Sequence, residues 1–196
     1  MALLSILAAA ALAASAAGRV YTSEHYDTQD QARAAMQAFK AEMAALGYRL
    51  TYDPRGQQVG PVGDSFYFAL AYDGFAVPQP QIYSSMVYAS PEKAKEGLRW
   101  FTDASLPLDL KIVEKGVRAR ADQSYFWARY LGDSPRAEQL ASPVYQTEAQ
   151  ASGGLQSCLG YAARARSVVL EKDLRLSNGQ PFYLIRYAGP KPACPY

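Results

Sequence analysis

Gln123-Ser-Tyr-Phe-Trp-Ala-Arg-Tyr-Leu131 is one of three similar stretches in this chain of 196 residues. The other two are Asp64-Ser-Phe-Tyr-Phe-Ala-Leu-Ala-Tyr72 and Gln180-Pro-Phe-Tyr-Leu-Ile-Arg-Tyr-Ala188, and the three align without a gap. Each contains a Ser or Pro followed by two aromatic residues and an apolar run. Similarity that returns about every sixty residues predicts a structural unit that is repeated three times.

Each of these stretches closes a longer unit that reads strand, helix, strand, strand. In the first unit, residues 19–26 read as a strand, and Thr28-Gln-Asp-Gln31 is a capping box that starts a helix. Gly47 suits the residue that follows the helix, and residues 48–52 begin the next strand. The apolar positions of this helix recur at helical spacing: Ala32, Met36, Phe39, Met43 and Leu46.

The second and third units follow the same plan. Residues 81–88 read as a strand, and Ser90-Pro91 supplies a helix N-cap with Pro in the first turn. In the third unit, residues 144–147 are the expected first strand and 168–176 pair with 182–187. Asn178-Gly179 predicts a tight hairpin turn between these last two strands, because both residues tolerate positive φ.

The sequence therefore predicts an α+β protein of three tandem βαββ units, at about 19–77, 81–134 and 143–190. A crossover helix predicts that the first two strands of a unit run parallel, and a hairpin predicts that the third returns antiparallel, in a mixed or antiparallel sheet. Units of ~60 residues bury little surface alone, so we expect residues 18–196 to pack as one compact domain.

The N-terminus has the features of a signal peptide. Residues 3–14 are apolar and uncharged, and Ala14-Ser-Ala16 is a small-x-small cleavage pattern, so residues 1–17 are predicted to be removed. The alternative is a retained anchor or plain helix. About fifteen apolar residues extend ~23 Å as a helix, short of the ~30 Å hydrocarbon core. We therefore expect a periplasmic or secreted protein with no stable membrane span after cleavage.

Cys158 and Cys194 are the only cysteines. An even cysteine count in a chain expected to be exported favours a disulfide, which would fix the C-terminal tail; two unrelated thiols are the alternative. The formal net charge is +2, which is too small to indicate nucleic-acid binding.

Alternation along the three repeated stretches assigns one set of side chains to a common face. Because both faces are largely apolar and one helix can cover only one of them, the other face is predicted to bind a partner or pack on a neighbouring sheet. The candidate binding residues are Tyr125, Trp127, Arg129, Phe182, Arg186 and Phe66. Tyrosine, tryptophan and arginine are enriched at protein interfaces, although core packing of these aromatics is the alternative interpretation.

No catalytic or metal-binding motif is present. His25 is the only histidine, so a cluster of two histidines or of Cys and His is excluded, and no cofactor is predicted. Arg118, Arg120, Arg164 and Arg166 alternate at two-residue spacing and could flank an anion or lie on a solvated edge.

Residues 31–75, with Leu46-Gly-Tyr48 at the helix end and the later Phe66-Tyr-Phe-Ala-Leu-Ala-Tyr-Asp-Gly74, resemble sporulation-related repeat domains. That family consists of exported modules that bind peptidoglycan. The opening strand departs from the family's pattern, so the resemblance implies a compartment and no site residues.

From these features we expect a non-enzymatic protein of the cell envelope or secreted space that binds a protein or a cell-wall polymer. Two alternatives stay open: a structural subunit of an envelope assembly, and an enzyme of a type that the motifs do not reveal. The oligomeric state is not predicted.

Overall fold

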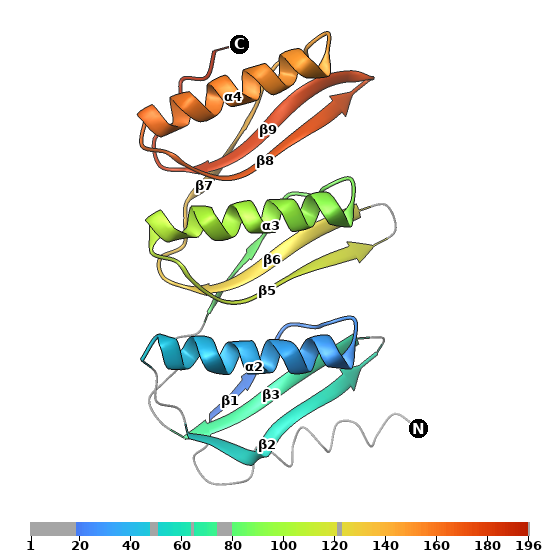
Figure 1. The fold of residues 1–196 in the computed structure, drawn as a ribbon, viewed down its shortest axis with the longest axis vertical. Coiled ribbons are helices and arrows are strands. Elements are labelled where there is room, and N and C mark those ends of the chain that lie inside the picture. The colour runs from blue at the N-terminus through green and yellow to red at the C-terminus, as the bar shows by residue number, and fades with distance from the viewer. Residues whose placement is uncertain (1–18, 48–50, 64, 74–79, 121–122, 196) are drawn as a thin grey trace. The chain divides into compact units, whose positions relative to one another are not determined.

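The structure, a computed structural model, describes residues 19–47, 51–63, 65–73, 80–120 and 123–195 (Figure 1). It confirms the α+β class and the three tandem βαββ repeats. The predicted signal peptide, residues 1–17, lies outside the described residues. Among the helices that are described, none combines the length and the apolar character needed to span a bilayer.

The repeats have matching elements. The first contains β1 (Arg19–Thr22), α2 (Gln29–Ala45), β2 (Thr51–Val62) and β3 (Ser65–Asp73). The second contains β4 (Gln81–Ser84), α3 (Pro91–Ser105), the short 3-10 helix η1 (Leu106–Leu108), β5 (Lys111–Arg120) and β6 (Gln123–Leu131). The third contains β7 (Ala137–Ala141), α4 (Glu148–Arg164), β8 (Val168–Ser177) and β9 (Gln180–Ala188).

The last strand of each repeat is the centre of its sheet. The strand orders are β1-β3-β2, β4-β6-β5 and β7-β9-β8, and every neighbouring pair is antiparallel. The two outer strands run parallel to each other, as expected, but the hairpin places the third strand between them. Each sheet is therefore fully antiparallel and not mixed.

The helix starts are confirmed in atomic detail. The Thr28 hydroxyl accepts from the Gln31 backbone N–H at 3.2 Å, and the Gln31 side chain accepts from the Thr28 N–H. Ser90 caps α3 through the Lys93 N–H, with Pro91 in the first turn. Thr147 and Gln150 form a third capping box, which starts α4. These caps satisfy backbone donors that a helix otherwise leaves unpaired.

The first strand of the third repeat was predicted at the wrong place. β7 spans Ala137–Ala141, upstream of the predicted residues 144–147. In the structure, residues 142–146 form the segment that leads into the cap of α4. Two backbone bonds hold this segment to β9, from the Ser142 N–H to the Tyr183 carbonyl and from the Tyr145 N–H to the Pro181 carbonyl. The misplacement arose because β7 contains two charged or amide residues and only one buried side chain, Leu140.

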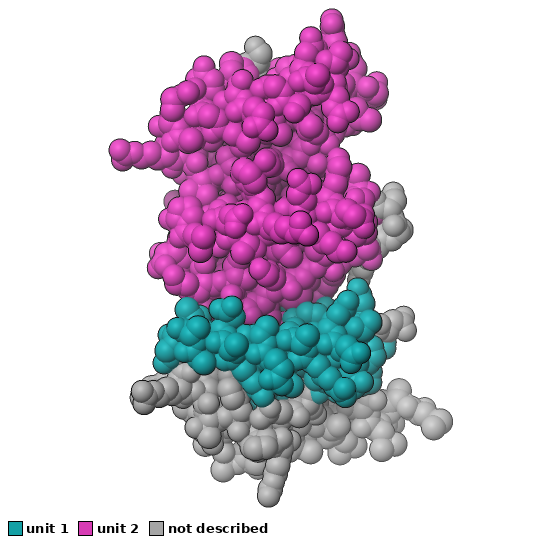
Figure 2. Space-filling view, in the orientation of Figure 1, with its two compact units in different colours: residues 1–79 teal, residues 80–196 magenta. Residues whose placement is uncertain are grey.

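The described chain divides into two compact units, residues 1–79 and 80–196 (Figure 2). The single domain 18–196 stays a prediction. Within residues 80–196 the layers alternate: the sheet β4-β6-β5, then α3, then the sheet β7-β9-β8, then α4 (Figure 1). Helix α3 therefore contacts both its own sheet and β8 of the following repeat.

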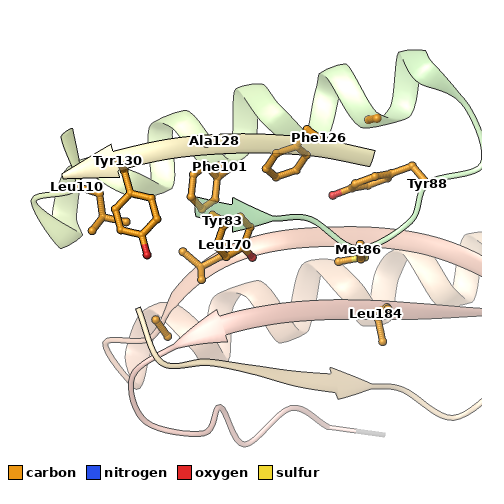
Figure 3. Close-up of a cluster of buried hydrophobic side chains, with 12 residues drawn as sticks. Tyr83, Met86, Tyr88, Phe101, Leu110, Phe126, Ala128, Tyr130, Leu170 and Leu184 are labelled. Carbon is orange, nitrogen blue, oxygen red and sulfur yellow. The ribbon is translucent and has the colours of Figure 1, made fainter. Parts of the chain in front are cut away.

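A cluster of buried side chains joins the second and third repeats (Figure 3). Tyr83 and Phe101 stack with ring centroids 4.3 Å apart, and Phe101 meets Phe126 at 5.5 Å. Leu170 and Leu184 from the third repeat complete the same cluster. The two repeats therefore share one hydrophobic core, as a short repeat that cannot bury enough surface alone requires.

Candidate interaction site

The gapless alignment is one residue out of register in the first repeat. Ser65 is the first residue after the hairpin turn and pairs with Val62, as Gln123 pairs with Arg120 and Gln180 with Ser177. Since register follows the turn, Phe66 corresponds to Ser124 and not to Tyr125. Phe66 thus shares the face of Phe68, which contacts Phe39 of α2, and it does not lie on the predicted binding face.

Tyr125, Trp127 and Arg129 do share the face of β6 that points away from α3. The Trp127 ring lies against Gly116 of β5, where an added Cβ would come within 2.9 Å of the indole. Arg129 pairs with the buried carboxylate of Glu114 at 3.1 Å. Binding of a partner by these three residues stays a prediction.

Phe182 and Arg186 lie on a face that is already occupied. Phe182 packs against the core shared by the second and third repeats. The Arg186 guanidinium donates to the Ser84 carbonyl and to Glu171 Oε1, each at 3.0 Å. The six predicted residues therefore do not form one open surface, and the aromatic and arginine face of the third sheet instead binds the second repeat.

The centre of this contact is the fully buried carboxylate of Glu171 on β8. Its oxygens accept from the Tyr83 hydroxyl at 2.6 Å, the Tyr88 hydroxyl at 2.9 Å and the Met86 backbone N–H at 2.9 Å. With Arg186, four donors from the two repeats converge on one side chain. Such charge-assisted bonds inside a protein fix the relative position of the two layers.

The two tyrosine hydroxyls in this network have strongly perturbed acidity. Burial first, and then the neighbouring Glu171 carboxylate and its hydrogen bond, raise the pKa of Tyr83 and Tyr88 far above the ordinary value of about 10. An ionised phenolate there would be desolvated beside a carboxylate. Both phenols therefore stay protonated in the folded chain.

We expect residues 80–196 to lose stability above about pH 10. The unfolded chain releases both phenolic protons there while the folded chain keeps them, so the free energy of unfolding falls by about 1 kcal/mol for each tyrosine between pH 10 and pH 11. Urea titrations at pH 8, 10 and 11 measure this slope. Tyr88→Phe should halve the loss between pH 10 and 11, whereas an unchanged slope would contradict the assignment.

Gly97 of α3 gives Tyr88 room to reach Glu171. A Cβ at Gly97 would lie 2.5 Å from the Tyr88 hydroxyl and 3.2 Å from the Phe126 ring. The third repeat has the same arrangement, because a Cβ at Gly154 would overlap the Tyr145 hydroxyl. At each glycine, the absence of a Cβ lets a tyrosine side chain pack directly against the helix backbone.

Gly97→Ala should lower the free energy of unfolding by about 2 kcal/mol, because the methyl group displaces the Tyr88 hydroxyl. Urea denaturation followed by tryptophan fluorescence measures the loss. Gly160→Ala is the matched control: Gly160 lies in α4 with open space around its Cα, so alanine should stabilise the helix by up to about 1 kcal/mol. Equal effects at the two positions would rule out the steric argument.

The prediction from sequence missed a repeated motif that organises these contacts. Ser23, Ser85 and Ser142 each accept from a central-strand N–H, at 2.8, 2.8 and 2.9 Å. Each lies three residues before a tyrosine and five before a helix cap, in the pattern Ser-x-x-Tyr-x-Ser/Thr at 23–28, 85–90 and 142–147. This spacing is visible in the sequence and gives the correct register.

A groove of about 440 Å³ lies between the second and third repeats. Trp100 of α3, Gln156 of α4 and Lys172 of β8 line it, together with charged residues of both signs: Lys93, Glu96, Arg99, Asp103 and Asp173. The Lys172 ammonium lies 3.6 Å from the Trp100 ring centroid. Burial lowers the pKa of Lys172, which Glu96 partly offsets.

The remaining candidates lie apart. The Arg118 guanidinium lies 5.7 Å from the Trp127 ring centroid, and the Arg164 guanidinium lies 4.2 Å from the Tyr161 ring centroid, so each of these two side chains packs on an aromatic ring of its own repeat. His25 is exposed. Within the described ranges of the chain, no three His, Cys, Asp or Glu side chains lie close enough together to hold a metal ion. Cys158 and Cys194 lie at disulfide distance, with sulfur atoms 1.93 Å apart.

Comparison with known proteins gives no relative: the chain matches no family model, no curated protein and no solved structure. The resemblance of residues 31–75 to sporulation-related repeat domains is therefore not supported by a family match.

Proposed function

We propose that this chain is an exported, non-enzymatic interaction protein that binds its partner in the groove between α3 and α4. The groove carries this proposal, because it has the volume of a binding site and is built by two repeats together. Trp100, with its exposed charged neighbours, provides the mixture of aromatic and polar contacts common at protein interfaces. The disulfide is compatible with an oxidising compartment.

A photo-crosslinking experiment tests the proposal. Benzoylphenylalanine at Gln156, which lines the groove, is compared with the same probe at Ala163, an exposed position on the same helix outside it. Each variant is incubated with soluble envelope proteins and, separately, with purified cell-wall polymer. We expect an adduct from position 156 that is absent from position 163. Equal labelling from the two positions, or no adduct from position 156, would reject the groove as the binding site.

A structural subunit of an envelope assembly is the second candidate. Such a subunit would have to use a surface other than the face with Phe182, Leu184 and Arg186, because that face packs against another layer within the chain. Sedimentation of the purified protein separates the two candidates, because an interaction protein is stable alone whereas a subunit copurifies with its neighbours or aggregates.

A further inference from the structure

We propose that an extended segment of a partner protein binds in the groove between α3 and α4 as an added strand, pairing with the outer edge of β8. This inference rests on the proposed function and specifies its ligand: a peptide with apolar side chains at alternate positions and charges of both signs. Recognition by strand addition uses backbone hydrogen bonds for affinity and pockets for specificity.

β8 is an outer strand of its sheet, and its hairpin with β9 shows which backbone groups point outward. β8 pairs only with β9 among the described strands. Asn178 and Gly179 have φ of 51° and 79°, which is a two-residue turn with both central residues at positive φ, so Ser177 and Gln180 form a hydrogen-bonded pair. Pairs alternate along an antiparallel ladder, and the backbone groups of Lys172 and Leu174 therefore point away from β9.

The groove opens at these two residues. Lys172, Asp173 and Leu174 all line it, between α3 on one side and α4 on the other. One backbone group near the start of β8 already has a partner outside the sheet: the Trp100 Nε1–H of α3 donates to the Val169 carbonyl at 2.8 Å. An added strand would continue this bonding along Lys172 and Leu174.

The walls define the chemistry of the segment. Leu155 and Leu174 provide apolar contacts for the side chains that an added strand turns toward α4, and Trp100 provides one for a side chain turned toward α3. Exposed charges of opposite sign, Arg99 and Asp103 on α3, flank the groove and suit a segment that carries both charges. The groove has a volume of about 440 Å³, which limits the part of the segment that it holds to a few residues. In a strand these residues follow one another at about 3.3 Å.

The test uses a peptide selected on the folded chain. A phage-displayed library of random dodecapeptides is panned against residues 18–196, and the best peptide is synthesised with single N-methyl groups along its backbone. We expect N-methylation to lower affinity at least tenfold at alternate positions and to change it less than threefold between them. Failure to select any peptide, or N-methyl effects without this alternation, would overturn strand addition.

A variant pair tests the edge itself. Leu174→Pro removes the outward N–H, and Leu174→Ala keeps it while trimming the same side chain; affinity should fall at least tenfold in the first relative to the second. Equal affinities in two folded variants would contradict the proposal. If Leu174→Pro does not fold, the N-methyl series decides.

If the chain forms a dimer and Leu174→Pro abolishes it, the edge instead binds a second copy of this chain. Adducts at position 156 without alternation would reject the added strand but retain the proposed function.

Discussion

Glu171→Gln should lower the free energy of unfolding of residues 80–196 by about 3–5 kcal/mol. The carboxylate is fully buried and accepts from Tyr83, Tyr88, Met86 and Arg186. A neutral amide turns one acceptor oxygen into a donor that faces other donors, and it leaves the Arg186 guanidinium without its counter-charge. Removing one partner of a buried pair costs more than an exposed pair contributes.

Urea denaturation followed by tryptophan fluorescence measures this loss, because both tryptophans, Trp100 and Trp127, lie in residues 80–196. At a slope of about 2 kcal/mol per molar urea, the midpoint should fall by about 2 M. Asp133→Asn, an exposed acid in the same unit, should change the free energy by less than about 0.5 kcal/mol. A loss below about 1 kcal/mol for Glu171→Gln would show that the network does not hold the repeats together.

The fold was predictable where local chemistry determines it. Thr28, Ser90 and the Asn178-Gly179 turn each have one favoured conformation, so the helix starts and the last hairpin follow from sequence alone. β7 was misplaced because its backbone pairing with β9, and not its side chains, defines it as a strand. Pairing between distant segments leaves little trace in local composition.

The candidate site was less predictable because the repeats dock on one another. Phe182 and Arg186 were expected on a face that binds a partner or packs on a neighbouring sheet, and the aromatic and arginine composition of that face is typical of an interface. Sequence does not reveal whether the other side of an interface is a partner or the next repeat. The groove is likewise hidden, since Trp100 and Lys172 are 72 residues apart and meet only when α3 packs against β8.

The third repeat has a disulfide where the second repeat has stacked aromatic residues. Phe101 and Cys158 occupy the same position, eleven residues after the caps Ser90 and Thr147. Phe101 stacks on Tyr83, whereas Cys158 joins Cys194 in a cluster with Leu140. The C-terminal tail thus fills space that aromatic rings fill in the second repeat.

Replacing both cysteines by alanine, Cys158→Ala and Cys194→Ala, should lower the free energy of unfolding by about 3–4 kcal/mol. A crosslink over a separation of 36 residues restricts the unfolded chain by about this amount on the chain-entropy model. Urea denaturation with and without reductant measures the effect: reductant should destabilise the wild-type chain to the level of the double variant and leave the variant unchanged. Thiol titration of the denatured, unreduced wild type should find no free thiol. Two reactive thiols would contradict the crosslink. The tail would then be held only by packing and by contacts such as the hydrogen bond that the Ser167 hydroxyl donates to the Pro190 carbonyl.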